Sequence, residues 1–301
     1  MQLDHSQLER YSKYQLILLV DLSVVTWIIF FLAPDLLSLN IQLLILLFTV
    51  TVIGIPHGYF DFLVAKYLFS SAPRWLLKFI IAYLFLSLVY LLIWFIAPVV
   101  GLVTFLLMAL YHFAHEETEN IESKNSLLAL SVGSVPIITP IIYHANDVFS
   151  LFSILLNEKI SVILLPDLYK YIYVILVLFI IFSYSRKLLL LYILLFINFI
   201  YLPPIASFIL YFCFHHSIRH YLYALNDQRL FEKKISLTKY VIFFLALTLA
   251  FTIFMLTTIS SIASLSLDEI IIKYIFITLA CLTLPHLLLN IIYEKKSNKH
   301  R

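Results

Sequence analysis

Histidine is the residue type in this chain whose placement most clearly indicates chemistry. The sequence has ten histidines, and seven of them lie toward one end of long apolar segments that are well separated along the chain. A single histidine at membrane depth usually makes a hydrogen bond between helices. Seven at one level on four helices instead indicate a shared metal site, because imidazole is the commonest metal ligand. The seven are His57, His112, His115, His215, His216, His220 and His286.

The stretch FHHSIRH at 214–220 has the spacing of a pair of metal ligands. His216 and His220 are four residues apart, so on a helix they share one face and can bind one ion. His215 is rotated by about 100° from His216. We therefore expect His215 to contact the ligands or the substrate instead of the metal.

Two acidic residues follow histidines by one helical turn. YHFAHEE at 111–117 places His112 over His115 and Glu116, and PHGYFD places Asp61 four residues after His57. A carboxylate in such a position can orient a ligating imidazole through its other ring nitrogen. The alternative is a solvated loop face, and both roles stay open for Glu116 and Asp61. For the rest of the acidic run we expect the solvated face: Glu117, Glu119 and Glu122.

The stretch GIPHGYFDF concentrates two of the four glycines of the chain around one histidine. Pro56 cannot donate to the helical ladder, and Gly54 and Gly58 permit unusual backbone and close approach. The stretch thus predicts a helix that is unwound around His57, which is tolerated at membrane depth only inside protein or beside a cavity. Pro285–His286 repeats the proline–histidine pairing near the end of the chain. A kink made for packing is the alternative for both pairs.

The composition determines the solvent of the protein. The chain of 301 residues is 63% hydrophobic and 12% charged, whereas soluble domains carry about 25% charged residues. This composition therefore predicts an all-α, polytopic transmembrane helical bundle, since helices form the hydrogen bonds of their own backbone groups in lipid. The net charge of +3 is small and its basic residues lie in loops and tails, which argues against nucleic acid as a partner. Cys213 and Cys281 lie in apolar runs and indicate no disulfide framework.

About ten spans are predicted, and they form one integral membrane domain over 1–301 with short polar tails. A stretch at 147–158 is too short to span and is expected to lie in the interface. The Pro203–Pro204 junction could make two spans one re-entrant unit, so eight or nine spans are the alternative. Lys and Arg alternate between loops in a way that puts both termini in the cytoplasm and the seven histidines near the inner face of the cell (inner) membrane. The predicted spans are 15–33, 38–56, 75–97, 99–115, 126–144, 161–184, 187–202, 204–223, 239–262 and 268–293.

Four segments, GIPHGYFDF, YHFAHEE, HHSIRH and the late LPH, together resemble the Brp/Blh family of β-carotene 15,15′-dioxygenases. The resemblance runs from the second predicted span to the last. It implies a membrane enzyme that uses non-haem iron, Fe(2+), held by histidines, to split β-carotene and O₂ into two molecules of all-trans-retinal. Family members supply retinal to rhodopsins, which implies a rhodopsin as a partner that receives the product. The iron ligands that the resemblance implies are His57, His112, His216 and His220.

The resemblance also leaves some positions open. Ala114 stands where the family commonly has glycine, so His115 could compete with His112 as a ligand, and the role of His286 is open. The implied substrate is a lipid-soluble carotenoid, which requires an apolar tunnel entered from the membrane lipid. Aromatic side chains that flank the histidines could line it, although core packing or an interfacial belt is the alternative. These are Tyr111, Phe113, Tyr211, Phe212, Phe214, Tyr221 and Tyr223, while Arg219 is expected to reach the lipid headgroups.

Two other functions fit parts of this pattern. A di-iron membrane desaturase or hydroxylase acting on a lipid also carries histidine clusters, but a second HxxHH segment is missing here. Such an enzyme would bind two irons per chain instead of one. A non-enzymatic bundle that carries haem or transports ions is the other alternative. Haem would give a Soret band, and an ion pathway would keep charges across the bilayer.

Overall fold

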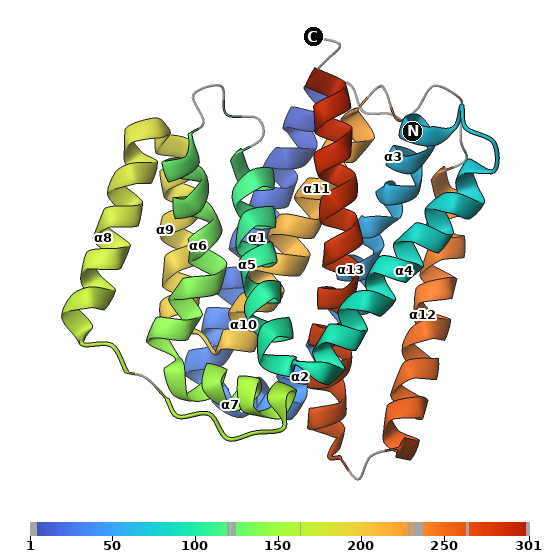
Figure 1. Cartoon of the computed structure of the whole chain (residues 1–301). Coiled ribbons are helices and arrows are strands. Elements are labelled where there is room, and N and C mark those ends of the chain that lie inside the picture. The colour runs from blue at the N-terminus through green and yellow to red at the C-terminus, as the bar shows by residue number, and fades with distance from the viewer. Residues whose placement is uncertain are drawn as a thin grey trace. The chain divides into compact units, whose positions relative to one another are not determined.

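The secondary structure of the described chain is entirely helical (Figure 1). The computed structural model describes residues 5–118, 121, 125–162, 164–227, 230, 237–262 and 265–298. Within these residues each predicted span overlaps a helical segment, and six helices are long and apolar enough to cross a membrane. The all-α membrane protein predicted from composition is therefore confirmed. The six are 6–32, 75–96, 98–118, 126–143, 167–184 and 267–296.

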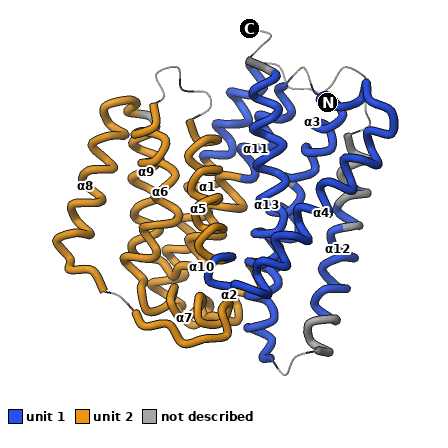
Figure 2. Tube along the Cα trace, in the orientation of Figure 1, with its two compact units in different colours: residues 1–16, 47–101, 217–301 blue, residues 17–46, 102–216 orange. Residues whose placement is uncertain are grey.

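Two compact units make up the chain (Figure 2). Unit 1 comprises residues 1–16, 47–101 and 217–301, and unit 2 comprises residues 17–46 and 102–216. The helices of unit 1 are α3 (Phe60–Phe69), α4 (Trp75–Ile96), α11 (Ile218–Asn226), α12 (Leu237–Ile262) and α13 (Leu267–Asn298), preceded by the short segments η2 (Val50–Gly54) and η3 (Ile55–Tyr59).

Unit 2 holds most of α1 (His5–Leu32), α2 (Leu39–Thr49), α5 (Pro98–Thr118) and the π-helix η4 (Ile209–Ser217). Its other elements are η1 (Pro34–Leu37), α6 (Ser126–Tyr143), α7 (Ala145–Leu156), α8 (Asp167–Tyr184), α9 (Arg186–Tyr201) and α10 (Pro204–Phe208). The stretch at 147–158, which was predicted to be too short to span, lies mostly in the short helix α7. The span predicted from residue 161 begins only at Asp167, directly after Pro166.

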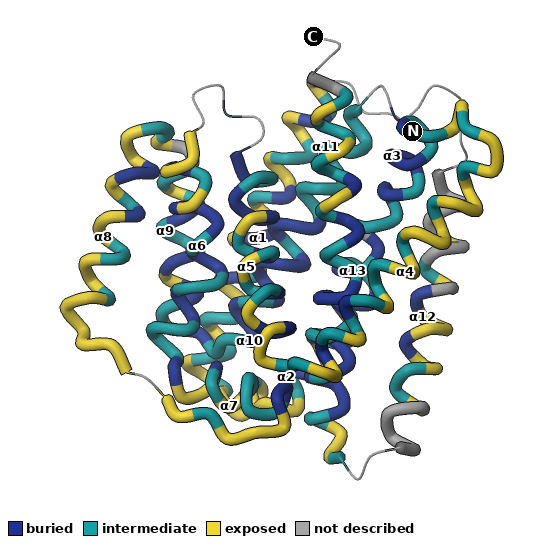
Figure 3. Tube along the Cα trace, in the orientation of Figure 1, coloured by how far each residue is buried: buried dark blue, intermediate teal, exposed yellow. Residues whose placement is uncertain are grey.

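Large apolar side chains are exposed along the long helices. On α4, Phe95 and Ile96 are 77% and 75% exposed, and exposed positions recur along α4 and α8 (Figure 3). Water would make so much apolar surface unfavourable, at about 25 cal/mol per Å². Lipid is therefore the solvent of these faces, and the buried positions mark the interior of each unit.

The helix around His57 changes its winding, but it is not unwound as the sequence predicted. The α-helix α2 changes to a π-helix at Val50 and to a 3₁₀-helix at Ile55, and α3 begins at Phe60. Pro56 accounts for this change of winding, because it has no backbone N–H to donate to the helical ladder. The glycines do not supply left-handed backbone, since no glycine among the described residues has positive φ. The second pair behaves differently, since Pro285 lies inside the continuous helix α13.

Unit 1 has its apolar core around α3, which packs against α4 and α13. The side chains of Leu63, Val64 and Leu68 form this core with Leu289 of α13. Asp61, in the first turn of α3, is buried together with these apolar side chains although it carries a carboxyl group. The apolar packing of α3 thus fixes the position of a carboxylate.

Unit 2 contains a close approach of α6 to α5. A Cβ atom built on Gly133 would lie 2.6 Å from the carbonyl oxygen of Leu110 and 2.7 Å from the Ala114 Cβ. Only glycine permits this contact, and Leu110 and Ala114 flank His112 on α5. The position of the α5 turn that carries His112 therefore depends on Gly133.

We expect Gly133→Ala to destabilise the protein by about 1–3 kcal/mol, because the added methyl group meets backbone atoms that cannot yield. Gly58→Ala is the matched control, since its added Cβ would have Asp61 Oδ2 as nearest atom, 3.9 Å away. Thermal unfolding in detergent should give a lower midpoint for Gly133→Ala than for Gly58→Ala. Equal midpoints would contradict the close approach.

Candidate metal centre

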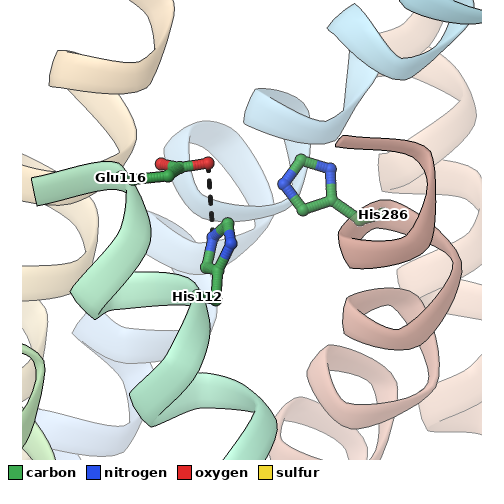
Figure 4. A group of neighbouring side chains, drawn as sticks. All are labelled: His112, Glu116 and His286. Carbon is green, nitrogen blue, oxygen red and sulfur yellow. Dashed lines mark ion pairs between the residues drawn. The ribbon is translucent and has the colours of Figure 1, made fainter. Parts of the chain in front are cut away.

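Unit 2 brings two of the predicted ligands into contact. His112 of α5 and His216 of η4 are both buried, and their Nε2 atoms lie 3.2 Å apart. Glu116, one turn after His112, has its carboxylate oxygens 3.6 Å from His112 Nε2 and 3.7 Å from His216 Nε2. Figure 4 draws the first of these ion pairs, together with His286 of unit 1. Of the two roles left open for Glu116, these contacts favour the one beside the histidines.

The separations in this group fit a divalent metal. A first-row ion such as zinc binds imidazole nitrogen at about 2.0–2.1 Å. Two ligands at that distance, spread by 90° to 109°, have nitrogens about 2.8–3.4 Å apart. The 3.2 Å between the Nε2 atoms of His112 and His216 falls in this range. Two imidazoles and a carboxylate also form a donor set that iron and zinc accept.

Aromatic rings enclose His216. The Phe113 ring meets it edge-on with centroids 4.8 Å apart, and the Phe212 ring stacks on it at 5.8 Å. Tyr211 is buried and contacts both Phe113 and His216. These rings keep water from the imidazole and restrict its rotation. The winding of η4 as a nine-residue π-helix is itself typical of functional sites.

Glu117 and His215 form a second buried pair between α5 and η4. The carboxylate oxygens of Glu117 lie 3.1 Å and 3.2 Å from His215 Nε2, and both side chains are buried. The prediction of a solvated Glu117 is therefore wrong. The reason is that α5 continues to Thr118, so Glu117 still lies on a helix face directed at η4. Glu119 and Glu122 lie outside the described residues.

Unit 1 holds a third histidine–carboxylate pair. Asp61 Oδ1 lies 2.7 Å from His286 Nδ1, and Tyr83 donates a hydrogen bond of 2.8 Å to Asp61 Oδ2. The imidazole of His220 lies beside that of His286, with ring centroids 5.5 Å apart. The sequence spacing offered His57 as one possible partner of Asp61, but the His57 side chain lies outside what the structure describes. The partner found is 225 residues away, so local spacing could not reveal it.

The remaining candidates lie around these groups. The ring of His115 lies 6.0 Å from that of Tyr111, which is half-exposed. Phe214 is half-buried on η4, and the Arg219 guanidinium lies over the Tyr223 ring at 5.3 Å. Two residues that sequence reasoning missed are Tyr83 and Asn290, whose amide nitrogen lies 3.1 Å from His286 Nε2. No sequence signal distinguishes Tyr83 from the other tyrosines of the chain.

A family model and a bacterial protein are similar to this chain. The family model described as beta-carotene 15,15′-dioxygenase matches residues 48–293. A protein named beta-carotene 15,15′-dioxygenase, from an uncultured marine bacterium (66A03), is 30% identical over 261 residues, which cover 80% of this chain and 90% of that protein. No solved structure matches the chain. The matched range contains the seven histidines singled out from the sequence and the three carboxylates described above, and the chain belongs to the β-carotene 15,15′-dioxygenase family of enzymes.

Proposed function

We propose that this protein cleaves β-carotene at its central 15,15′ double bond with O₂ and releases two molecules of all-trans-retinal. One Fe(2+) ion would be held by His57, His112, His216 and His220. Family membership and the name of the bacterial relative support the reaction. The proposed metal site is supported most directly by the buried His112–His216 pair, whose Nε2 atoms lie 3.2 Å apart, with Glu116 beside both.

The reaction is balanced without a further reductant or oxidant. One carbon–carbon double bond and the O–O bond break, and two carbonyl groups form. A bound iron would supply the activation of O₂ that this step needs. Four neutral imidazoles leave the ion its full charge and leave positions open for a small molecule.

The residues of the chain supply the apolar surroundings that a polyene requires. Phe113, Tyr211 and Phe212 enclose His216 with hydrocarbon surface and keep water away from it. The substrate dissolves in lipid, and the exposed apolar faces of the helices are in contact with lipid, so entry from the bilayer needs no aqueous path. In this proposal the protein lies in the cell (inner) membrane with both termini in the cytoplasm and passes retinal to a rhodopsin.

The reaction is tested by expressing the chain in cells that make β-carotene. We expect the orange colour to fade and retinal to accumulate in extracts analysed by chromatography. The variants His57→Ala, His112→Ala, His216→Ala and His220→Ala should each abolish retinal formation, because each removes a proposed ligand. His144→Ala is the matched control, since His144 lies at the end of α6 beside the exposed Asp147.

Unchanged β-carotene with the unaltered chain present in the membrane would count against the reaction. Full activity of His216→Ala would instead refute the ligand assignment. The two outcomes separate the proposed chemistry from the proposed ligand set.

The Glu117–His215 pair is expected to hold η4 against α5 and so to keep His216 facing His112. Removing one partner of a buried hydrogen-bonded pair costs about 1–3 kcal/mol, and more for charged groups, because the other partner remains buried without compensation. We expect Glu117→Ala to lower the unfolding midpoint strongly, and Glu117→Ala/His215→Ala to be less destabilised than the sum of the single variants. Asp147→Ala, which removes an exposed carboxylate 3.9 Å from His144, should cost at most about 1 kcal/mol. Equal effects of Glu117→Ala and Asp147→Ala would show that the buried pair does not hold η4.

A further inference from the structure

Asp61 is a buried carboxylate with an unusually complete set of contacts. It is 3% exposed, accepts the hydrogen bond from Tyr83 Oη at 2.8 Å on one oxygen, and lies 2.7 Å from His286 Nδ1 on the other. The three residues come from α3, α4 and α13, all of which belong to unit 1. Since the packing of α3 against α4 and α13 forms the unit 1 core, Asp61 is held rigidly behind the imidazole of His286.

This contact determines which nitrogen of His286 can bind a ligand. An ionised carboxylate only accepts hydrogen bonds, so Nδ1 of His286 carries the proton that faces Asp61. In the neutral ring the lone pair is then on Nε2. The amide nitrogen of Asn290 lies 3.1 Å from Nε2 and can only donate, which agrees with a lone pair at that atom. Asn290 is one turn away on the same helix, so its side chain can rotate aside when a stronger electron-pair acceptor binds.

The charge of Asp61 requires a balancing cation. Among the described residues no lysine or arginine forms an ion pair with it, and a buried carboxylate without compensation is strongly unfavourable. Two cations could act through His286: a second proton on the ring, or a metal ion on Nε2. A metal ion on Nε2 would use the lone pair that the Asp61 contact leaves at that atom once the Asn290 amide has moved aside.

His286 also lies beside a proposed ligand. Its ring centroid is 5.5 Å from that of His220, and the two planes are inclined by 63°. The His112–His216 pair of unit 2 has a similar arrangement, with 5.0 Å and 74°. A carboxylate behind the distal nitrogen of an imidazole is the usual support of a metal-binding histidine.

We propose that His286 is an additional metal ligand, through Nε2, and that Asp61 is the residue that positions it, with Tyr83 holding the second oxygen of Asp61. The inference rests on the proposed function, since the metal concerned is the iron of that reaction. It adds a histidine outside the four-ligand set and gives the Asp61 carboxylate a role.

The test measures metal binding apart from catalysis. The full chain is purified in detergent, stripped with a chelator and titrated with Co(2+) without oxygen, while the visible absorption of the bound ion is recorded. Asp61→Asn should weaken Co(2+) binding about 10–100-fold, as loss of a supporting carboxylate does. His286→Ala should weaken it at least as much and change the visible spectrum, because a ligand is lost.

Tyr274→Phe is the matched control. Tyr274 is also a buried residue of α13 in unit 1, and its hydroxyl lies 2.6 Å from that of Thr252. Its loss should affect the unfolding midpoint and leave Co(2+) affinity and spectrum unchanged. A purely structural role of Asp61 and His286 would give the same result for their variants.

The outcomes distinguish this inference from the proposed function. If His112→Ala loses Co(2+) binding while His286→Ala keeps the affinity and the spectrum of the unaltered chain, the inference is overturned and the proposed function stands. If the unaltered chain binds metal with the expected His286 dependence but leaves β-carotene intact, the inference stands and the proposed reaction falls. Absence of metal binding by the unaltered chain would overturn both.

Discussion

Burying ionisable side chains in an apolar solvent is the constraint on which this structure depends. A carboxylate or an imidazole at membrane depth is unfavourable unless a partner balances it. The chain nevertheless buries Asp61, Glu117, His112, His216 and His286, and each has a partner of the other chemical type or a second imidazole within contact distance. Burial of so many ionisable groups in a chain that is 63% hydrophobic indicates function, because apolar side chains at the same positions would make folding more favourable.

Irregular helices position these groups. His57 lies in a 3₁₀ segment that follows a π-helix, and His215 and His216 lie near the end of a nine-residue π-helix. Changes of winding rotate the side chains that follow, so neighbouring residues can face different partners. His216 faces His112, whereas His215 faces Glu117. Close approach of helices completes the arrangement, as at Gly133, where α6 contacts the turn of α5 that carries His112.

The features of the fold that depend on composition or on local spacing could be predicted from the sequence. Composition indicated the all-α membrane protein and GIPHGYFDF indicated an irregular helix around His57, while the i,i+4 spacing of His112 and Glu116 left their contact as one of two alternatives. Prediction from the sequence failed where a contact joins distant segments. The partner of Asp61 is His286, 225 residues away, and Glu117 was expected in solvent because nothing local shows that α5 continues through it toward His215. Pairings of this kind depend on how helices pack, which periodicity and spacing do not encode.

We propose that histidines from separate helices hold one iron ion per chain. X-ray absorption at the iron K-edge of the purified, iron-loaded protein tests it most directly, combined with the iron content per chain. The account predicts one iron, with the outer-shell scattering of several imidazole rings and without scattering from a second iron. Two irons per chain with an iron–iron distance in the spectrum, or a bound iron without imidazole scattering, would contradict it.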